Sequence, residues 1–274
     1  AAAGVPRGDR VAILSENRPE WALTDWACLC SGVVDVPIYP TLSATQVAYI
    51  LRDSGARLAF VSSKEQAEKI RASAADLGRP IPVVSFDGED GGATPWPDFL
   101  DAGRGSALDP AAFRAGALET RPHDLATVLY TSGTTGDPKG VMLTHNNIAS
   151  NVRASETILA ISSADNTISF LPLSHILQRM VDYLFFWTGC RIGYPRSLDT
   201  LIVDLKRLEP TVVVSVPRIY EKIYNGVMDA RGLKKKLIDW AVGVADRAAD
   251  LRLAGRSPSG LLALQYAIAD RPVF

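Results

Sequence analysis

The chain has 274 residues, with 29 Lys and Arg against 30 Asp and Glu, and 47% of its residues are hydrophobic. This composition is ordinary for globular proteins and argues against disorder, collagen-like repeats and a coiled coil. The length fits one large domain or two small ones. The balanced charge lacks the basic excess that nucleic-acid binding usually requires, so we expect no nucleic-acid partner.

The chain has three cysteines, an odd number, and Cys28 and Cys30 stand among apolar residues without the spacing of a zinc site. We therefore expect reduced, packed thiols, a cytoplasmic location and no metal held by side chains alone. The richest apolar run, residues 180–190, is shorter than the roughly 20 residues that span a bilayer. The first four residues have no signal-peptide pattern, and both ends of the chain look cut.

Apolar β-branched runs alternate with helical patterns, which is typical of parallel strands joined by crossover helices. Pro19 suits the first turn of a helix, and Gly32 ends it. Between residues 88 and 121 the pattern lapses into Gly, Pro and Asp, which predicts a long surface excursion. In the first half we expect strands at residues 10–14, 35–39, 57–61, 82–86, 126–131 and 140–144, and helices at residues 19–31, 43–52, 64–77 and 146–159.

The second half repeats this alternation and then becomes helical. The sequence therefore predicts an α/β fold of two layered, mostly parallel subdomains. Residues 1–157 would form the first, ending with the loop at residues 130–140, and residues 158–274 part of the second, with a helical extension. Here we expect strands at residues 166–171, 191–194 and 211–216, and helices at residues 175–187, 198–208, 219–228, 234–253 and 260–274.

The segment YTSGTTGDPKG, residues 130–140, carries the most chemical information. Its hydroxyls, glycines and single lysine suit a concave anion site, in which backbone N–H groups and a point charge face a polyanion such as a nucleotide triphosphate. It is not a Walker loop, because Pro138 stands where that motif requires glycine. The alternative is a plain hairpin rich in turn-forming residues.

Residues 130–145, YTSGTTGDPKGVMLTH, resemble the phosphate-binding signature of the adenylate-forming (AMP-binding) superfamily. Three further segments resemble long-chain fatty-acid CoA ligases in particular: SENRPEW, FLPLSHILQR and SVPRIYEKIYNGV. The resemblance spans nearly the whole chain. It implies that a long-chain fatty acid attacks ATP to give acyl-AMP, and that coenzyme A then displaces AMP to give acyl-CoA.

The resemblance also implies roles for particular residues. His175 would lie near the reacting carboxylate, although a local helix cap is the alternative. Tyr220 would stand as a gate between the ATP cavity and the acyl tunnel, although it could simply be a packing residue. Lys139 would contact the β/γ end of ATP. The residues expected to wrap the phosphates are Thr131, Ser132, Gly133, Thr134, Thr135 and Gly136.

Other polar residues give weaker indications of function. His145 follows a strand and is expected to be structural, whereas His123 is expected to be a solvated linker residue. Three consecutive lysines at residues 234–236 adjoin apolar side chains and could touch an anionic membrane surface, as interfacial amphipathic helices do. The alternative is an ordinary solvated helix face.

Several elements that the resemblance implies are not found in this sequence. They are the glutamate that helps to hold Mg²⁺, the ribose-binding aspartate and the lid domain with its catalytic lysine. We therefore expect no detectable ligase turnover from the 274 residues alone, which a pyrophosphate-release assay would test. One alternative is an adenylating enzyme for an aryl or amino acid, against which the charged Arg179 and Asp182 near His175 and the helical extension argue weakly. Another is a nucleotide-binding module without catalysis.

Overall fold

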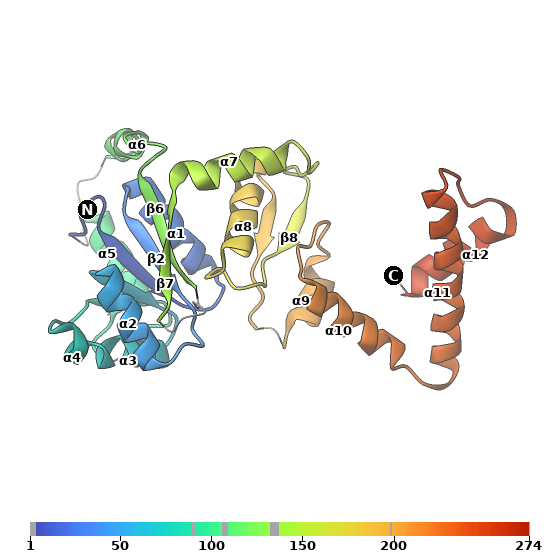
Figure 1. Cartoon of the computed structure of the whole chain (residues 1–274), viewed down its shortest axis with the longest axis horizontal. Helices are drawn as coiled ribbons and strands as arrows, with labels where there is room; N and C mark the ends of the chain where they lie inside the picture. Colours follow the sequence, from blue (N-terminus) through green and yellow to red (C-terminus); the bar gives the residue numbers. More distant parts are fainter. Residues whose placement is uncertain (1–3, 89–90, 106–108, 132–136, 198, 274) are drawn as a thin grey trace. The chain divides into compact units, whose positions relative to one another are not determined.

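The computed structural model describes residues 4–88, 91–105, 109–131, 137–197 and 199–273 (Figure 1). The chain divides into two compact units, unit 1 (Ala1–Val214) and unit 2 (Ser215–Phe274). Every strand that the described residues form belongs to unit 1.

Unit 1 is built on a seven-stranded sheet in the order β5-β4-β3-β1-β2-β6-β7. Neighbouring strands are parallel except for β7, which runs antiparallel to β6 at one edge. The mostly parallel α/β fold and the six predicted strands are confirmed. The strands are β1 (Arg10–Leu14), β2 (Val34–Ile38), β3 (Leu58–Val61), β4 (Val83–Ser85), β5 (Thr94–Pro95), β6 (Leu125–Thr131) and β7 (Lys139–Thr144).

Helices cover both faces of this sheet. In β1, Ala12 and Leu14 join the core beneath α2 and α3, whereas Val11 joins the core beneath α1 and α5. Because both faces of β1 and β3 are covered, these strands are runs of buried apolar residues instead of alternating with polar ones. These helices are α1 (Pro19–Ser31), α2 (Ala44–Ser54), α3 (Lys64–Ala72) and α5 (Trp96–Arg104); the helix predicted at residues 64–77 breaks at Ser73, with α4 (Ala74–Leu77) beyond it.

The helix ends follow local sequence signals. Gly32 ends α1 in the left-handed conformation, with a φ of 65° that favours glycine. Ser43 begins α2 with a capping box, in which its hydroxyl and the Gln46 side chain each satisfy a backbone N–H group. Thr144 caps α7 (His145–Glu156) in the same way together with Asn147.

The segment predicted as a surface excursion, residues 88–121, is more regular than expected. It contains β5, α5 and α6 (Pro110–Leu118). Trp96 and Phe99 on α5 pack edge-on against Phe60 of β3, with ring centroids 6.0 and 5.3 Å apart. Aromatic contacts over a long sequence separation therefore hold α5 on the sheet, which a local reading of Gly and Pro content does not detect.

A second, two-stranded sheet pairs β8 (Asn166–Ile168) with β9 (Arg191–Gly193) in parallel. Between these strands runs α8 (Ile176–Thr188), and α9 (Leu201–Leu208) follows β9. The strand predicted at residues 211–216 is wrong, because only an isolated bridge joins Val212 to Thr167. A β-branched run becomes a strand only where a neighbouring strand supplies a continuous series of backbone hydrogen bonds. The neighbour here, β8, is three residues long and meets this run at one bridge.

Unit 2 is helical, as the sequence predicts for residues beyond 216. It contains α10 (Pro217–Met228), α11 (Gly232–Leu253) and α12 (Gly260–Val273). Small buried side chains join α11 to α12, with Ala241 and Val244 packed against Ala269. The boundary expected near residue 157 separates the large sheet from the small one, whereas the compact units divide after Val214. The two-subdomain assignment of residues 1–157 and 158–274 stays a prediction.

Gly140 in β7 provides a test of the hairpin packing. A Cβ atom at this position would lie 2.9 Å from Val128 Cγ1 and 3.2 Å from Tyr130 Cζ. We expect Gly140→Ala to lower the free energy of unfolding by about 1–3 kcal/mol, as overpacking does. Gly116→Ala is the matched control, because a Cβ atom there meets nothing within 4 Å in α6 and should stabilise by about 0.5–1 kcal/mol. Urea denaturation would measure both, and equal effects would contradict the packing argument.

Candidate functional site

Three parallel strands end at the same edge of the large sheet. β1, β2 and β6 are neighbours, so Leu14, Ile38 and Thr131 stand at adjacent carboxyl ends. In open α/β sheets, ligands bind outside the carboxyl ends of the strands. We therefore expect the predicted site residues to lie at this carboxyl edge.

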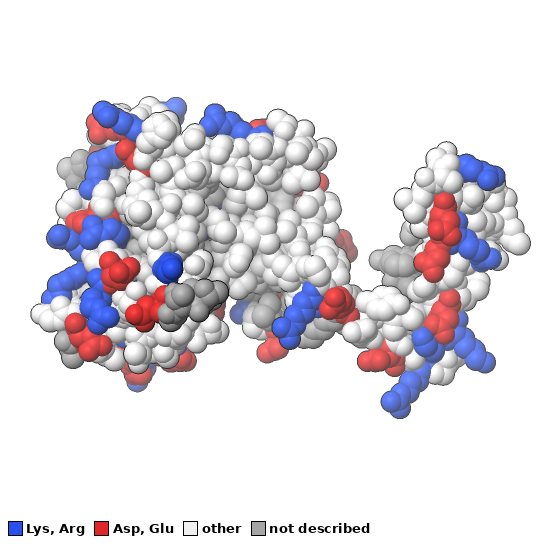
Figure 2. Space-filling view, in the orientation of Figure 1, with Lys and Arg blue, Asp and Glu red and all other residues white. Residues whose placement is uncertain are grey.

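Two of the predicted phosphate contacts, Thr131 and Lys139, face each other across the β6–β7 hairpin at this edge. Both are exposed, and among the described residues Lys139 takes part in no ion pair. The other predicted phosphate contacts, Ser132, Gly133, Thr134, Thr135 and Gly136, lie outside the described residues. In Figure 2 acidic and basic side chains gather together mainly toward the left and lower margins of unit 1, whereas a broad stretch in the middle of this face is uncharged.

Tyr130 fastens the base of the hairpin to α2. Its hydroxyl donates a hydrogen bond of 2.6 Å to Asp53 Oδ2. Burial raises the pKa of Tyr130, and the Asp53 carboxylate raises it further, so the phenol stays neutral and keeps donating. The strand end that carries Thr131 is thus anchored one residue before the predicted loop begins.

His175 belongs to the same edge although it comes from the other half of the chain. It caps α8, and its Nδ1 accepts the Leu177 N–H at 3.2 Å, so the proton of the neutral ring stands on Nε2. The preceding Ser174 hydroxyl donates to the carbonyl of Ile38, at the end of β2, over 3.3 Å. The ring is exposed, so the cap leaves Nε2–H free to donate to a ligand. The capping alternative is thus confirmed, and it is compatible with a binding role.

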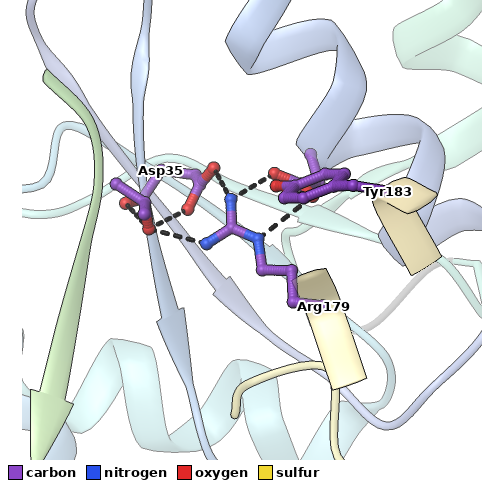
Figure 3. A network of polar contacts seen from close by, with 5 residues as sticks. Asp35, Arg179 and Tyr183 are labelled. Atoms are coloured by element: carbon purple, nitrogen blue, oxygen red, sulfur yellow. Dashed lines mark hydrogen bonds and ion pairs between the residues drawn. The ribbon is translucent and has the colours of Figure 1, made fainter. Parts of the chain in front are cut away.

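Sequence reasoning missed a buried ionic network one turn further along α8 (Figure 3). Arg179 Nη2 contacts the carboxylates of both Asp25 on α1 and Asp35 on β2. Its Nη1 donates to Thr127 Oγ1 on β6 at 2.7 Å. The Tyr183 hydroxyl also donates to Asp25, at 2.7 Å. All five side chains are buried, so the only visible signal was isolated charged residues in otherwise apolar helices and strands.

The network contains two carboxylates and one guanidinium. Burial raises the pKa of Asp35, and the nearby Arg179 charge offsets this only in part. Burial also works against the charge of Arg179, but Asp25 and Asp35 together hold its pKa above the ordinary value. The guanidinium therefore stays charged and holds α1, α8, β2 and β6 together.

Asp182, on the next turn of α8, is also buried. Gln178 Nε2, the Ser169 hydroxyl and the Tyr194 hydroxyl donate to it at 2.7, 2.9 and 3.1 Å. Burial raises its pKa to about 6 against the lowering effect of these hydrogen bonds. Arg179 and Asp182 are thus both committed to internal contacts, so their charges do not bear on the choice between a fatty acid and an aryl or amino acid substrate.

Other predicted residues lie elsewhere. Tyr220 is on α10 in unit 2, where 57% of it is exposed, and its gating role stays a prediction. His145 is the first residue of α7 and half-buried, and burial lowers its pKa. Lys235 pairs with Asp239 at 2.7 Å on α11, so one of the three lysines is internally neutralised. No described helix is long and apolar enough to cross a membrane.

An open groove of about 760 Å³ lies at the opposite, amino edge of the large sheet. Pro122 before β6, Cys30 before β2, and Trp26, Tyr183 and Phe186 contribute to its lining. None of the predicted site residues within the described part of the chain lines it. The groove and the carboxyl edge are therefore separate features.

Removing the cation of the buried network should destabilise unit 1. Arg179→Met leaves Asp25 and Asp35 without a counter-charge, and we expect the free energy of unfolding to fall by about 3–5 kcal/mol. Arg179→Lys keeps the charge but loses the planar fork, so it should fall between the wild type and Arg179→Met. Arg153→Met, at an exposed position of α7, is the control and should change stability by less than about 0.5 kcal/mol. Equal losses in urea denaturation for Arg179→Met and Arg153→Met would refute the role of the network.

The raised pKa of Asp182 predicts a pH dependence. In the unfolded chain this carboxyl ionises near its ordinary pKa of 3.8, whereas the folded protein holds the proton to about pH 6. Its contribution to stability is therefore full below pH 4 and is lost as the pH rises to 6, by on the order of 3 kcal/mol. Asp182→Asn should remove this contribution. Unfolding free energies of both proteins at pH 4, 5, 6 and 7 would test it, and parallel pH profiles would rule it out.

Known proteins are similar to this chain in sequence. Residues 1–261 match the family model of the AMP-binding enzyme. The chain is 35% identical to long-chain-fatty-acid–CoA ligase FadD15 of Mycobacterium bovis, over 99% of this chain and 45% of that protein. It is 34% identical to peroxisomal long chain acyl-CoA synthetase 6 of Arabidopsis thaliana, over 93% of this chain and 37% of that protein. The chain thus spans less than half the length of these relatives.

The fold of this chain is also similar to the folds of solved structures. The N-terminal domain of FACL13 from Mycobacterium tuberculosis, bound to an inhibitor, superposes with a TM-score of 0.68 at 25% identity, over 84% of this chain and 54% of that one. ATP-bound MatB from Rhodopseudomonas palustris gives a TM-score of 0.66 at 27% identity, over 81% of this chain and 42% of that one. The family model covers most of the chain and the relatives align along nearly all of it, so this chain belongs to the AMP-binding, adenylate-forming enzyme family.

Proposed function

We propose that this chain is part of a long-chain fatty-acid CoA ligase, which activates the fatty acid with ATP to acyl-AMP and then transfers the acyl group to coenzyme A. The observation that carries the proposal is the hairpin at the carboxyl edge, where Thr131 and Lys139 of the YTSGTTGDPKG segment face each other and Lys139 is in no ion pair with another described residue. The named relatives, both long-chain acyl-CoA ligases, support the choice of substrate.

In the first step a carboxylate oxygen attacks the α-phosphorus of ATP. The bond from this phosphorus to the bridging oxygen breaks, and pyrophosphate leaves with the electron pair. Such transfers depend mainly on positioning and charge stabilisation. The exposed ammonium of Lys139 suits the negative charge that collects on the departing pyrophosphate. In the second step the thiol sulfur of coenzyme A attacks the acyl carbon, the bond from this carbon to the phosphate oxygen of AMP breaks, AMP leaves with the electron pair, and the thiol proton passes to water.

His175 contributes a hydrogen-bond donor in this proposal. Because Nδ1 accepts the Leu177 N–H, the donor that the exposed ring can offer is Nε2–H. That donor suits a carboxylate or phosphate oxygen placed at the carboxyl edge. Mg²⁺ is the usual companion of ATP, but within the described part of the chain no three His, Cys, Asp or Glu residues could hold a metal ion. The proposed steps therefore assign no residue of this chain to a metal.

Binding of a non-hydrolysable acyl-adenylate mimic tests the proposal without requiring turnover. We expect a long-chain acyl sulfamoyl adenosine to bind this chain, and Lys139→Ala to weaken the binding of ATP by about tenfold or more, since a charged hydrogen bond contributes about 1.5–3 kcal/mol. Lys206→Ala, at an exposed position of α9, is the matched control and should leave both affinities unchanged. Isothermal titration calorimetry would measure the dissociation constants of ATP and of the acyl-adenylate mimic.

The same titrations distinguish the substrate classes. Tighter binding of an aryl or aminoacyl sulfamoyl adenosine than of the long-chain compound would contradict the fatty-acid assignment. Equal ATP affinity for the wild type, Lys139→Ala and Lys206→Ala would contradict the role of Lys139.

A further inference from the structure

Asn17 lies just beyond β1, at the carboxyl edge, and reaches the loop between β8 and α8. Its Nδ2 donates to the carbonyl of Ser169 at 3.1 Å and to that of Leu171 at 2.6 Å. Its Oδ1 accepts the backbone N–H of Leu173 at 2.9 Å. Three hydrogen bonds thus join this one side chain to backbone groups more than 150 residues away in the sequence.

The loop that Asn17 holds leads directly to His175. Leu173 is buried against Ile13 and Trp21, and the next residue, Ser174, is bonded to the end of β2. These contacts fix the loop on one side, and Asn17 fixes its backbone on the other. The direction in which α8 begins, and with it the place of the His175 ring, therefore depends on this clamp.

The clamp requires an amide. Aspartate keeps an acceptor for the Leu173 N–H but loses both donated hydrogen bonds and sets a negative charge beside the carbonyls of Ser169 and Leu171. Alanine loses all three bonds. In the described structure the hydrogen bonds of Asn17 go to residues 169, 171 and 173 and not to His175, so its effect on that residue passes through the loop backbone.

We propose that Asn17 is a positioning residue that places His175 at the carboxyl edge of the sheet. The placement stands on the hydrogen bonds alone, whereas its consequence for ligand binding rests on the proposed function. Asn17 has no charge, and its hydrogen bonds in the described structure go to the loop before α8, so its role differs from those of Thr131 and Lys139.

The imidazole resonances provide a direct test, because the chain has three histidines, which His175→Gln would separate. In Asn17→Asp we expect the His175 Cε1–H resonance to move and the Leu177 amide to exchange at least tenfold faster, while His123 and His145 stay unchanged. Asn151→Asp, at an exposed position of α7, is the matched control and should move none of them. An unchanged His175 resonance and Leu177 exchange rate in folded Asn17→Asp would overturn the proposal.

If Asn17→Asp does not fold, hydrogen exchange of the unaltered protein still tests the clamp. The Leu173 amide should then be protected like the amides of β1, and exchange at the rate of an open loop would overturn the proposal.

Binding of the long-chain acyl-adenylate mimic separates the two proposals. Weaker binding by both His175→Ala and Asn17→Asp, with a moved His175 resonance, supports both. A moved resonance with unchanged affinity in both variants supports the positioning by Asn17 and removes the proposed binding role of His175. Weaker binding by His175→Ala alone, with an unmoved resonance in Asn17→Asp, removes only the positioning role.

Discussion

The guanidinium of Arg179 is the interaction on which the arrangement of unit 1 depends. It joins α8 to α1 through Asp25, to β2 through Asp35 and to β6 through Thr127. Taking a guanidinium and two carboxylates out of water is costly, and the contacts repay that cost only when all partners are in place. Such a network stabilises one arrangement of the elements and penalises others, because any displacement of α8 would leave a buried charge without its partner.

The ionic network also affects the arrangement of the carboxyl edge of the sheet. Arg179 stands one helical turn beyond His175, so the position of the ionic network along α8 also limits where that helix begins. The strands β1, β2 and β6 end at the same edge, where Asn17, Ile38 and Tyr130 each anchor a segment that carries a candidate site residue. The predicted site residues Thr131, Lys139 and His175 are exposed, whereas the anchoring hydrogen bonds of Asn17, Ile38 and Tyr130 are at least partly buried. Rigid support beneath an accessible surface is the arrangement expected of a preorganised site.

Local signals predicted most of the large sheet. Parallel strands covered on both faces are continuous apolar runs, and Gly32, Ser43 and Thr144 mark helix ends by short-range backbone chemistry. Predictions failed where structure depends on distant partners. The helix α5 is held by Phe60 and Phe86, and the β-branched run at residues 211–216 forms no strand because it meets only a single bridging residue.

The candidate site likewise has parts that contiguous residues predicted and parts that depend on distant contacts. The hydroxyl-rich, lysine-containing segment and its likeness to an adenylate-forming signature are properties of contiguous residues, so the sequence indicated the family and the hairpin by itself. The Asn17 side chain holds backbone groups of residues 169–173, and Arg179 pairs with Asp25 and Asp35. Each of these contacts joins groups that are more than 140 residues apart in the sequence. No periodicity or spacing reveals which buried charges or amides will meet. That choice arises only when the sheet and the helices pack, because burial makes an unpaired charge or amide too costly to tolerate.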